Sequence, residues 1–257
     1  MSNTAVVTGA ASGIGLEATR DLLDRGWTVY GLDVNQQQLD QAAAGIGSDR
    51  LVMMTCDMRS DEAVRTTMAE IGAKAGEINA LICSAGMIKT GALAEMSIED
   101  FDLIFSVNVR GLWLSCREAM PWLRVAADAG NLARVILLSS VSALRPKKHS
   151  GAYAASKAAV SQLTRVLAVE CAEHGILVNA LAPGTVDTPM IRGQSDAIKQ
   201  GAWRPSGPSP LGRVAEARDI VRVMRFLLSE DAAYVTGTVI PVDGGTQAAY
   251  VPPLTSN

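Results

Sequence analysis

The side chains with the most distinctive chemistry in this sequence are a tyrosine and a lysine, Tyr153 and Lys157, four residues apart. Residues at this spacing lie on one face of a helix, so the phenol and the ammonium would be neighbours. A phenol with its usual pKa near ~10 is a poor base at neutral pH, but a nearby positive charge favours the phenolate. The spacing alone is common on protein surfaces, and its meaning depends on the surrounding residues.

Two serines, Ser139 and Ser140, precede this pair at the end of the apolar run Val135–Leu138. Such a run is typical of a buried strand, and ligands of open α/β sheets bind beyond the carboxyl ends of the strands. A serine hydroxyl at that edge can hydrogen-bond a substrate oxygen as charge develops on it. Serine, tyrosine and lysine together suit proton transfer to or from an alcohol or carbonyl oxygen.

A glycine-rich turn lies near the N-terminus, between an apolar run and a helix-like stretch. It contains Gly9, Gly13 and Gly15, where a Cβ would obstruct either the approach of a diphosphate or the packing of helix on strand. The following helix offers unpaired N–H groups and the positive end of its dipole to an anion. No Lys follows Gly15, which excludes a GxxxxGK[ST] phosphate loop. The turn therefore predicts a dinucleotide site.

An aspartate, Asp33, follows the second apolar run and has no basic residue beside it. A carboxylate there can accept hydrogen bonds from both ribose hydroxyls of an adenosine and would repel a 2′-phosphate. Asp33 therefore favours NAD over NADP as the cofactor. The alternative interpretation is an N-cap for the next helix.

Short apolar runs alternate with longer amphipathic stretches along the chain, and these elements would position the side chains above. The predicted strands are Ala5–Thr8, Thr28–Leu32, Leu51–Thr55, Ala80–Cys83, Val135–Leu138, Ile176–Leu181 and Val239–Val242. The predicted helices lie near Gly13–Arg25, Asn35–Ala44, Asp61–Ala73, Ile98–Met120, Tyr153–Glu173 and Glu216–Leu228. This alternation predicts an α/β fold: a doubly wound (Rossmann) parallel sheet of about seven strands, with helices on both faces.

The size and composition of the chain agree with one domain over residues 1–257. The hydrophobic fraction of 48% with only 4% aromatic residues predicts a core of Ala, Val, Leu and Ile, as in helices laid on a parallel sheet. A net charge of −3 without a polybasic stripe argues against nucleic acid as a partner. No apolar run could span a bilayer and no signal peptide is recognisable, so we expect a soluble, cytoplasmic protein.

Cysteine and histidine are too scattered to suggest a metal site. The four cysteines, Cys56, Cys83, Cys116 and Cys171, show no C-x-x-C pairing, and the chain has only two histidines. We expect reduced, mostly buried thiols and no bound metal.

One irregular stretch, from Thr188 to Gly212, interrupts the alternation with four prolines and four glycines. A long irregular segment inside a compact domain is either functional, here as a substrate loop, or a plain surface excursion. Both interpretations stay open from the sequence.

Taken in order, several of these motifs resemble the classical short-chain dehydrogenases/reductases over nearly the whole chain. The matching residues are Thr8-Gly9 through Gly15, Asp57, Asn108-Val109-Arg110-Gly111, Ser140, Tyr153 with Lys157, Pro183-Gly184 and Val242-Asp243-Gly244-Gly245. Ser140 lies thirteen residues before Tyr153, as the family pattern expects. The resemblance implies an NAD-dependent oxidoreductase that interconverts a secondary alcohol and a ketone.

The resemblance also implies roles for individual residues. Asn108, Ser140, Tyr153 and Lys157 would form the catalytic tetrad, with Tyr153 as general acid/base, Lys157 holding the nicotinamide ribose and Asn108 anchoring a water that links Lys157 to solvent. Asp57 and the backbone of Met58 would hold the adenine, and Val186 and Thr188 would meet the nicotinamide carboxamide. The full implied cofactor site is Gly9, Ser12, Gly13, Ile14, Gly15, Asp33, Asp57, Met58, Ala85, Gly86, Tyr153, Lys157, Pro183, Gly184, Val186 and Thr188.

Three positions carry qualifications. Ser84 stands where family members usually have Asn, and because Ser can make some of the same backbone bonds we expect only a small cost in stability. Asp57, judged without the family, could equally cap the helix that begins near Ser60. Ser139 competes with Ser140, and we expect it only to line the pocket.

The substrate is less sharply indicated. The segment Arg145-Pro146-Lys147-Lys148-His149 precedes Tyr153, and the later excursion adds Arg192, Lys199 and Arg204. A cationic pocket mouth would steer a carboxylate-bearing or phosphorylated substrate, while solvated surface charge is the plainer interpretation. The stretch from Pro183 to Met190 resembles that of dihydrodiol and dihydroxybenzoate-forming dehydrogenases, which suggests a cyclic or carboxylate-bearing alcohol. Neither the physiological substrate nor the reaction direction follows from the sequence.

Two apolar-faced helices, Ile98–Met120 and Tyr153–Glu173, predict a partner subunit, because one face of each must cover the sheet and another is left over. The family is usually tetrameric through these helices, so we expect a homotetramer. Two rival functions fit the sequence less well. A methyltransferase would not keep Ser140, Tyr153 and Lys157 in register, and a catalytically silent nucleotide-binding sensor or scaffold would not need an intact tetrad.

Overall fold

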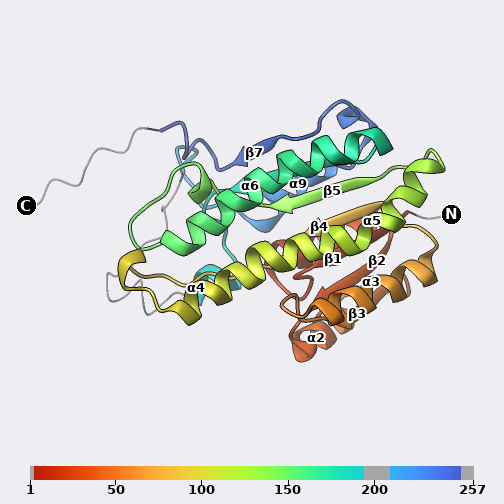
Figure 1. The fold of residues 1–257 in the computed structure, drawn as a ribbon, viewed down its shortest axis with the longest axis horizontal. Helices are drawn as coiled ribbons and strands as arrows, with labels where there is room; N and C mark the ends of the chain where they lie inside the picture. The colour runs from red at the N-terminus through yellow and green to blue at the C-terminus, as the bar shows by residue number, and fades with distance from the viewer. Residues whose placement is uncertain (1–2, 194–208, 250–257) are drawn as a thin grey trace, which may run out of the picture.

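The computed structural model describes residues 3–193 and 209–249, and its centre is a seven-stranded parallel sheet (Figure 1). The strands are β1 (Thr4–Thr8), β2 (Thr28–Asp33), β3 (Leu51–Thr55), β4 (Ala80–Cys83), β5 (Arg134–Leu138), β6 (Leu177–Pro183) and β7 (Val239–Val242). Their order across the sheet is β3-β2-β1-β4-β5-β6-β7. The order reverses between β1 and β4, where doubly wound sheets open a crevice beyond the strand ends.

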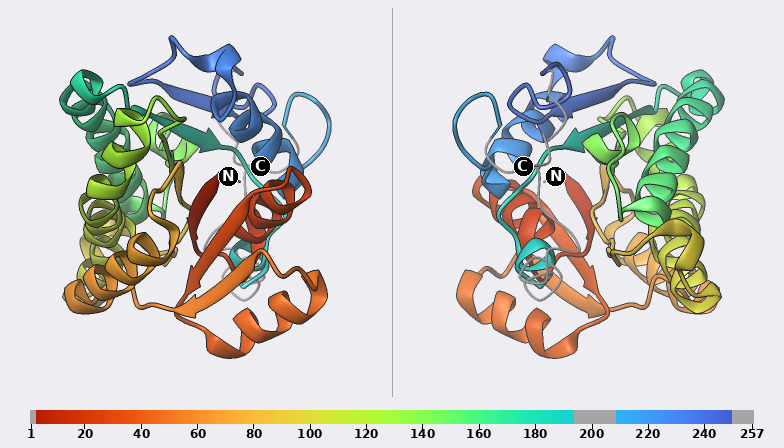
Figure 2. Two further views of the ribbon diagram at one scale, coloured as in Figure 1. Left: turned by 90° about the vertical axis from the view of Figure 1, so that its right-hand side faces the viewer. Right: turned by 90° about the vertical axis from the view of Figure 1, so that its left-hand side faces the viewer.

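Helices cover both faces of this sheet, as Figure 2 shows. One face carries α1 (Gly13–Asp24) and α9 (Ala217–Leu227), which pack together, and α2 (Gln36–Ile46) at the β2–β3 edge. The other face carries α3 (Asp61–Ala75), α5 (Leu112–Asp128) and α6 (Gly151–Cys171). The predicted doubly wound parallel sheet is confirmed.

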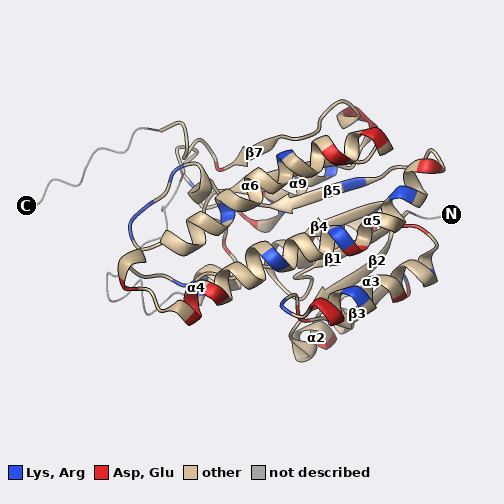
Figure 3. Ribbon diagram, viewed as in Figure 1, with Lys and Arg blue, Asp and Glu red and all other residues tan. Residues whose placement is uncertain are grey.

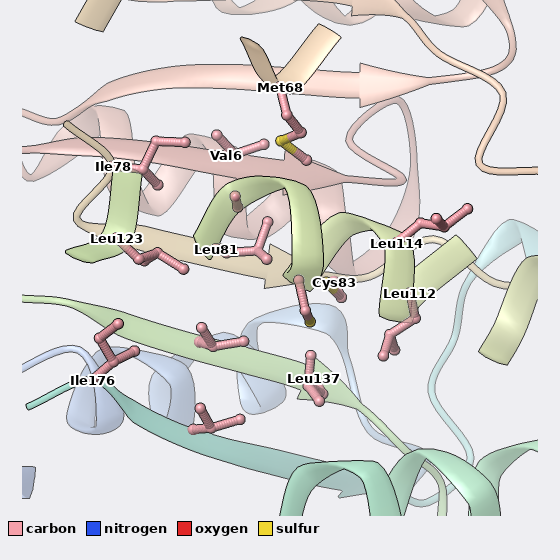
Figure 4. Packing of buried hydrophobic residues seen from close by; sticks show 14 of the residues in the cluster. Val6, Met68, Ile78, Leu81, Cys83, Leu112, Leu114, Leu123, Leu137 and Ile176 are labelled. Atoms are coloured by element: carbon pink, nitrogen blue, oxygen red, sulfur yellow. The ribbon is translucent and has the colours of Figure 1, made fainter. Parts of the chain in front are cut away.

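Two apolar clusters, one on each face, hold the layers together. The strands β1, β4 and β5 are buried along their whole length, which is why they appear as continuous apolar runs in the sequence. Figure 4 shows the larger cluster, in which Met68 of α3, Leu81 of β4 and Leu123 of α5 are fully buried. All four cysteines are free and buried. This packing fixes the carboxyl ends of the central strands, where the candidate site lies.

The predicted helix Ile98–Met120 is not one continuous α-helix, and this part of the prediction is wrong. The chain forms α4 (Ile98–Phe105), a π-helical turn over Ser106–Gly111 and then α5, which continues to Asp128. Within the turn, the Asn108 side chain is fully buried, and a Cβ at Gly111 would lie 2.6 Å from the Met58 carbonyl oxygen. The wider turn accommodates both the inward amide and this close approach.

The irregular stretch after β6 begins with the short helix α7 (Pro189–Arg192), for which Thr188 is the N-cap. Residues 194–208, which include Lys199 and Arg204, lie outside the described residues, so the substrate-loop role of this stretch stays a prediction. Within the described ranges, no helix is long and apolar enough to cross a membrane.

Candidate active site

The glycine-rich turn after β1 is shaped by backbone contacts that no larger residue would allow. A Cβ at Gly9, where φ is +68°, would lie 2.7 Å from the Ala85 nitrogen, and one at Gly15 would lie 2.1 Å from the Gly9 carbonyl oxygen. The first contact seats the turn on the loop after β4, and the second brings α1 tightly against the turn. Ser12 is the N-cap of α1, yet its hydroxyl makes no capping hydrogen bond. The N-terminus of α1 is therefore open to an anion.

A cavity of about 470 Å³ lies in front of this turn and extends along the carboxyl ends of β1, β2 and β4. Ten residues of the predicted cofactor site line it: Gly9, Ser12, Gly13, Ile14, Asp33, Asp57, Met58, Ala85, Gly86 and Thr188. Its walls also include Leu32, Cys56 and Val107, which give it a largely apolar surface. A largely apolar cavity that is lined by a glycine-rich turn and lies at the carboxyl ends of the strands is typical of a dinucleotide site.

Four other predicted cofactor residues are not among the described lining residues of this cavity. Gly15 packs on Gly9, Pro183 ends β6 opposite Val242, and Val186 is buried in a bridge with Ala215. Gly184 lines a second, smaller cavity of about 50 Å³ that also contains Ser140 and Tyr153. Met190 of α7 lines both cavities and so lies at their junction.

Asp33 points its carboxylate at the glycine-rich turn. The Ala11 N–H donates to Asp33 Oδ2 at 3.3 Å, and the Asn35 N–H donates to Asp33 Oδ1 at 3.1 Å. The N-cap of α2 is Asn35, whose side chain accepts from the Gln38 N–H. The alternative interpretation of Asp33 as a helix cap is therefore wrong, and its carboxylate lies on the cavity wall.

Asp57 is held by an arginine that the sequence analysis did not single out. Arg59, two residues on, donates to both carboxylate oxygens of Asp57, and these hydrogen bonds hold the pKa of Asp57 below its usual value. The cap of α3 is Ser60, which accepts from the Ala63 N–H, so the capping interpretation of Asp57 is also wrong. Asp57 and Arg59 line the cavity as a pair.

Tyr153 and Ser140 meet at the smaller cavity. Ser140, at the end of β5, caps the short 3₁₀ turn Val141–Ala143 by accepting from the Ser142 N–H at 3.1 Å. Tyr153 lies in the first turn of α6. Burial raises the pKa of Tyr153, and a hydrogen bond with Ser140 partly counteracts that rise. The lowering that we expect from Lys157 and the positive nicotinamide together concerns the cofactor complex; in the protein alone, burial is the larger influence.

Lys157 is buried one turn further along α6, with only 5% of its surface exposed. Its Nζ donates to the Leu138 carbonyl oxygen at 2.7 Å and lies 5.8 Å from the centre of the Tyr153 ring. Burial disfavours the charged form of Lys157 and lowers its pKa to about 8. The side chain therefore stays mostly protonated at neutral pH, at a small cost in free energy. The side chain points inward beside Tyr153, as the predicted pairing requires.

Asn108 connects the loop after β4 to α6. Its Oδ1 accepts from the Met87 N–H at 2.8 Å, and its Nδ2 donates to the Met87 carbonyl and to Ser156 Oγ, each at 3.0 Å. A Cβ at Gly86 would lie 3.3 Å from Asn108 Oδ1 and 3.5 Å from Lys157 Nζ. Gly86 is therefore the point at which the cofactor cavity, Asn108 and Lys157 come together.

Two serines differ from what we expected. The Ser139 hydroxyl does not face the pocket; it bonds the Lys157 carbonyl at 3.0 Å and Ser161 Oγ at 2.8 Å, which fastens β5 to α6. For Ser84, no side-chain hydrogen bond is formed within the described part of the chain. The backbone next to it is held by Thr8, whose Oγ1 accepts from the Ala85 N–H at 3.1 Å.

Comparison with known proteins gives matches over almost the full length of the chain. A family model described as enoyl-(acyl carrier protein) reductase matches residues 9–247. The 2-(R)-hydroxypropyl-CoM dehydrogenase of Xanthobacter autotrophicus is 32% identical over 256 residues, covering 96% of this chain and 100% of that protein. The cis-4-hydroxycyclohexanecarboxylate dehydrogenase of Sinomonas cyclohexanicum is 33% identical over 246 residues, covering 95% and 96%.

The fold is similarly shared with solved structures. The 3-ketoacyl-(acyl-carrier-protein) reductase of Brucella melitensis, complexed with NADH, superposes with a TM-score of 0.85 at 27% identity, covering 95% of this chain and 98% of that one. The family-model match, residues 9–247, includes the described lining of both cavities.

Proposed function

This chain belongs to the classical short-chain dehydrogenase/reductase family, and from that premise we propose that it is an NAD(H)-dependent oxidoreductase with Tyr153 as its general acid/base. Its relatives are oxidoreductases that act on CH–OH groups. The observation that carries the proposal is that Tyr153 and Ser140 line the same small cavity, near the buried Lys157, and that Met190 joins this cavity to the one in front of the glycine-rich turn.

The cofactor cavity fits a nicotinamide dinucleotide. The turn at Gly9 and Gly15 leaves room for a diphosphate against the backbone, and the hydroxyl of Ser12, which makes no capping hydrogen bond, adds a donor at the N-terminus of α1. Gly13, Ile14, Met58, Ala85 and the other lining residues would hold the remaining groups. When bound, the oxidised cofactor supplies a hydride acceptor and a positive charge near the phenol.

Residues of the chain itself would then transfer the proton. Ser140 would donate a hydrogen bond to the substrate oxygen, and Tyr153 would take the hydroxyl proton in oxidation and return it in reduction. Lowering a phenol pKa by about three units requires roughly 4 kcal/mol of differential stabilisation. The Lys157 ammonium supplies part of this, which is why its own burial next to the Tyr153 ring matters.

Lys157 and Asn108 would also have supporting roles. The Lys157 ammonium would bind the nicotinamide ribose, exchanging or sharing the bond that it now makes with the Leu138 carbonyl. Asn108, fixed by its bonds to Met87 and Ser156, would anchor a water that links Lys157 to solvent. Thr188 and Val186 would meet the carboxamide from the opposite side.

The preference for NAD over NADP rests on Asp33. Its carboxylate, oriented by the Ala11 and Asn35 N–H groups, would accept hydrogen bonds from the adenosine ribose and repel a 2′-phosphate. Arg59 is the one basic residue among the described lining residues that could attract that phosphate, but it is already paired with Asp57. The net environment therefore favours the uncharged 2′-hydroxyl.

For the substrate, we propose a secondary alcohol and its ketone, with a cyclic or carboxylate-bearing alcohol as the favoured class. A relative named for a hydroxycyclohexanecarboxylate supports this class. The smaller cavity, with Ile88, Val141 and Met190 around Ser140 and Tyr153, offers apolar contacts to a compact carbon skeleton.

We also propose a homotetramer built on the outer face of α4–α6. Trp113, Val166 and Val169 are exposed there, and Phe105, Val109 and Leu163 line a shallow apolar hollow between these helices. Apolar surface of this kind is typical of a subunit contact. Light scattering at micromolar concentration is expected to give the mass of four chains, and a monomer would refute this part of the proposal.

The experiment that tests the proposal is a screen of secondary alcohols with NAD⁺ and of ketones with NADH, in which turnover is measured by the change in NADH absorbance. We expect turnover with at least one pair, which also identifies the reaction direction. A protein that binds NADH, measured by its fluorescence, but turns over none of the panel would be a silent nucleotide sensor instead. Failure to bind NADH at all would remove the cofactor assignment as well.

A further inference from the structure

The polar side chains of the smaller cavity differ in whether the protein already uses them. Ser150 donates its hydroxyl to the Lys147 carbonyl oxygen at 2.9 Å. Thr185 and Lys147 also line the cavity, and each already has a partner. Ser142 lines the same cavity, and its hydroxyl makes no hydrogen bond within the described part of the chain. Apart from the proposed proton-transfer pair, Ser142 therefore carries the uncommitted polar group among the described lining residues.

The position of Ser142 is fixed by backbone hydrogen bonds. Ser142 is the middle residue of the 3₁₀ turn Val141–Ala143, and its N–H donates to Ser140 Oγ at 3.1 Å. The Ala143 N–H closes this turn by donating to the Ser140 carbonyl oxygen at 3.0 Å. A hydroxyl on a fixed turn loses little conformational freedom when it binds a ligand. The uncommitted hydroxyl is thus held next to the serine that would bind the reacting oxygen.

The size of the cavity limits how far a second substrate oxygen can lie from the reacting one. The volume of about 50 Å³ has room for roughly four groups the size of a water molecule. Two neighbouring carbons, each with one oxygen, fill this space. Much of the remaining wall is apolar and offers contacts to carbon: Ile88, Val141, Met190 and Ile191. The cavity therefore accommodates a second oxygen best on the carbon next to the reacting one.

Several basic residues lie in the loop that leads into α6, where Figure 3 marks them along the ribbon. Arg145 donates to the Thr246 carbonyl oxygen. Lys148 is exposed and is not among the described lining residues of the cavity, and Lys147 already has a partner. The group available to a second substrate oxygen is thus the neutral hydroxyl of Ser142. Because a hydroxyl can both donate and accept, it suits another hydroxyl or a carbonyl oxygen.

We propose that Ser142 is a specificity-determining residue that binds a second substrate oxygen, on the carbon next to the reacting one. The substrate is then a vicinal diol, and the product is the corresponding α-hydroxy ketone. In oxidation the carbinol C–H bond breaks and the hydride passes to NAD⁺, the hydroxyl proton passes to Tyr153, and the neighbouring hydroxyl is retained. This inference rests on the proposed function and narrows its substrate from a secondary alcohol in general to one with two adjacent oxygens.

The kinetic test compares matched substrates. Butane-2,3-diol is compared with butan-2-ol, and cyclohexane-1,2-diol is compared with cyclohexanol and with cyclohexane-1,3-diol, whose second oxygen lies one carbon further away. After correction for the two equivalent carbinols of each diol, we expect the wild type to prefer the vicinal diols by about 5- to 50-fold in kcat/KM. Ser142→Ala should reduce this preference to within about twofold, mostly through KM, because the hydroxyl takes part in binding rather than in proton transfer.

The matched control is Ser150→Ala, which removes from the same cavity a hydroxyl that is already donated to the Lys147 carbonyl oxygen. This control should keep the diol preference within about threefold of the wild type. Calorimetry then measures the binding of cyclohexane-1,2-diol to the NADH complex, which cannot oxidise it. The diol should bind Ser142→Ala at least about fivefold more weakly than the wild type or Ser150→Ala. NADH affinity on the same samples reports whether each variant is folded.

The outcomes separate this inference from the proposed function. A wild type that turns over single alcohols or cyclohexane-1,3-diol as well as the vicinal diols, or better, would overturn the inference. An equal loss of diol preference in both serine variants would do the same, and either result would leave the oxidoreductase proposal intact. No turnover of any alcohol or ketone would instead refute the proposed function.

Discussion

The two ends of the candidate site are built in opposite ways. At the cofactor end, between β1, α1 and β2, the shape comes from the backbone: Gly9 and Gly15 pack where a Cβ would clash with backbone atoms 2.7 and 2.1 Å away. At the catalytic end, between β5 and α6, the shape comes from buried functional side chains, Ser140 and Lys157 among them. An added side-chain atom at the cofactor end should therefore clash with the backbone. At the catalytic end, removal of a functional side-chain atom should instead impair the chemistry.

Electrostatics separates the two ends as well. Asp33 and Asp57 give the cofactor end carboxylates that are oriented by backbone N–H groups and by Arg59, close to solvent. The catalytic end instead buries a cation, and this burial lowers the pKa of Lys157 to about 8. Substitutions at the cofactor end should change which cofactor binds. Substitutions at the catalytic end should change the rate of the reaction and its pH dependence.

The largest expected effect is at the catalytic end. Tyr153→Phe removes one oxygen and should lower kcat by about 10³-fold or more, because the general acid/base is lost. NADH affinity, measured by fluorescence titration, should stay within about threefold, since the cofactor cradle is untouched. Activity within tenfold of the wild type would show that another group carries the proton.

Adding one carbon at the cofactor end is expected to have the next largest effect. Gly15→Ala places a Cβ against the Gly9 carbonyl, so we expect a loss of about 3 kcal/mol in the free energy of unfolding and weaker NADH binding. The matched control is Gly45→Ala in α2, where nothing lies within 4 Å of the new methyl. That control should be neutral or stabilising by about 0.5–1 kcal/mol. Similar urea midpoints for the two variants would contradict the tight packing at Gly15.

The buried Lys157 predicts a pH effect on stability. Its pKa is lowered from 10.5 to about 8, so between these values the unfolded chain binds more protons than the folded one. The unfolding free energy of the wild type should therefore rise from pH 8 to 10.5 relative to Lys157→Met, by up to about 3 kcal/mol. Lys147, also lowered to about 8, is present in both proteins and cancels in the difference. Parallel stability curves from urea unfolding would show that Lys157 is not buried as a cation.

The smallest predicted effect concerns cofactor choice. Asp33→Ser should lower the ratio of kcat/KM for NAD⁺ over NADP⁺ by about 10- to 100-fold, because it removes a charged acceptor and a repulsion of the 2′-phosphate. The control is Asp24→Ser, an exposed aspartate at the far end of α1. If the wild type already prefers NADP⁺, or if both variants behave alike, the assignment of NAD through Asp33 is wrong.

The fold could be predicted from the sequence because the residue patterns that indicate its strands and its glycine-rich turn are local. The apolar runs that become β1, β4 and β5 are buried on both faces, so their composition alone identifies them as strands of a parallel sheet. The glycine-rich turn was equally readable, since glycine is required there by contacts within a few residues of the turn and with Ala85.

What the sequence did not show depends on tertiary contacts. The sequence pattern predicted a continuous helix across the π-helical turn at Asn108. The turn depends on the buried Asn108 amide and on the approach of Gly111 to Met58, which are tertiary contacts. In the protein alone, burial raises the pKa of Tyr153, and burial of a single side chain is not visible in residue spacing. The pairing of Arg59 with Asp57 could have been predicted from the sequence, because the two residues are only two positions apart.

The central claim is that Tyr153 works on a substrate held at the junction of the two cavities. A crystal structure of the complex with NAD(H) and a substrate identified in the screen tests this most directly. We predict the Tyr153 hydroxyl and Ser140 Oγ both within about 2.6–3.2 Å of the substrate oxygen, with the nicotinamide ring beside the reacting carbon and the diphosphate on the turn at Gly13. A Tyr153 hydroxyl directed away from the substrate, with Lys157 turned out to solvent, would contradict the account.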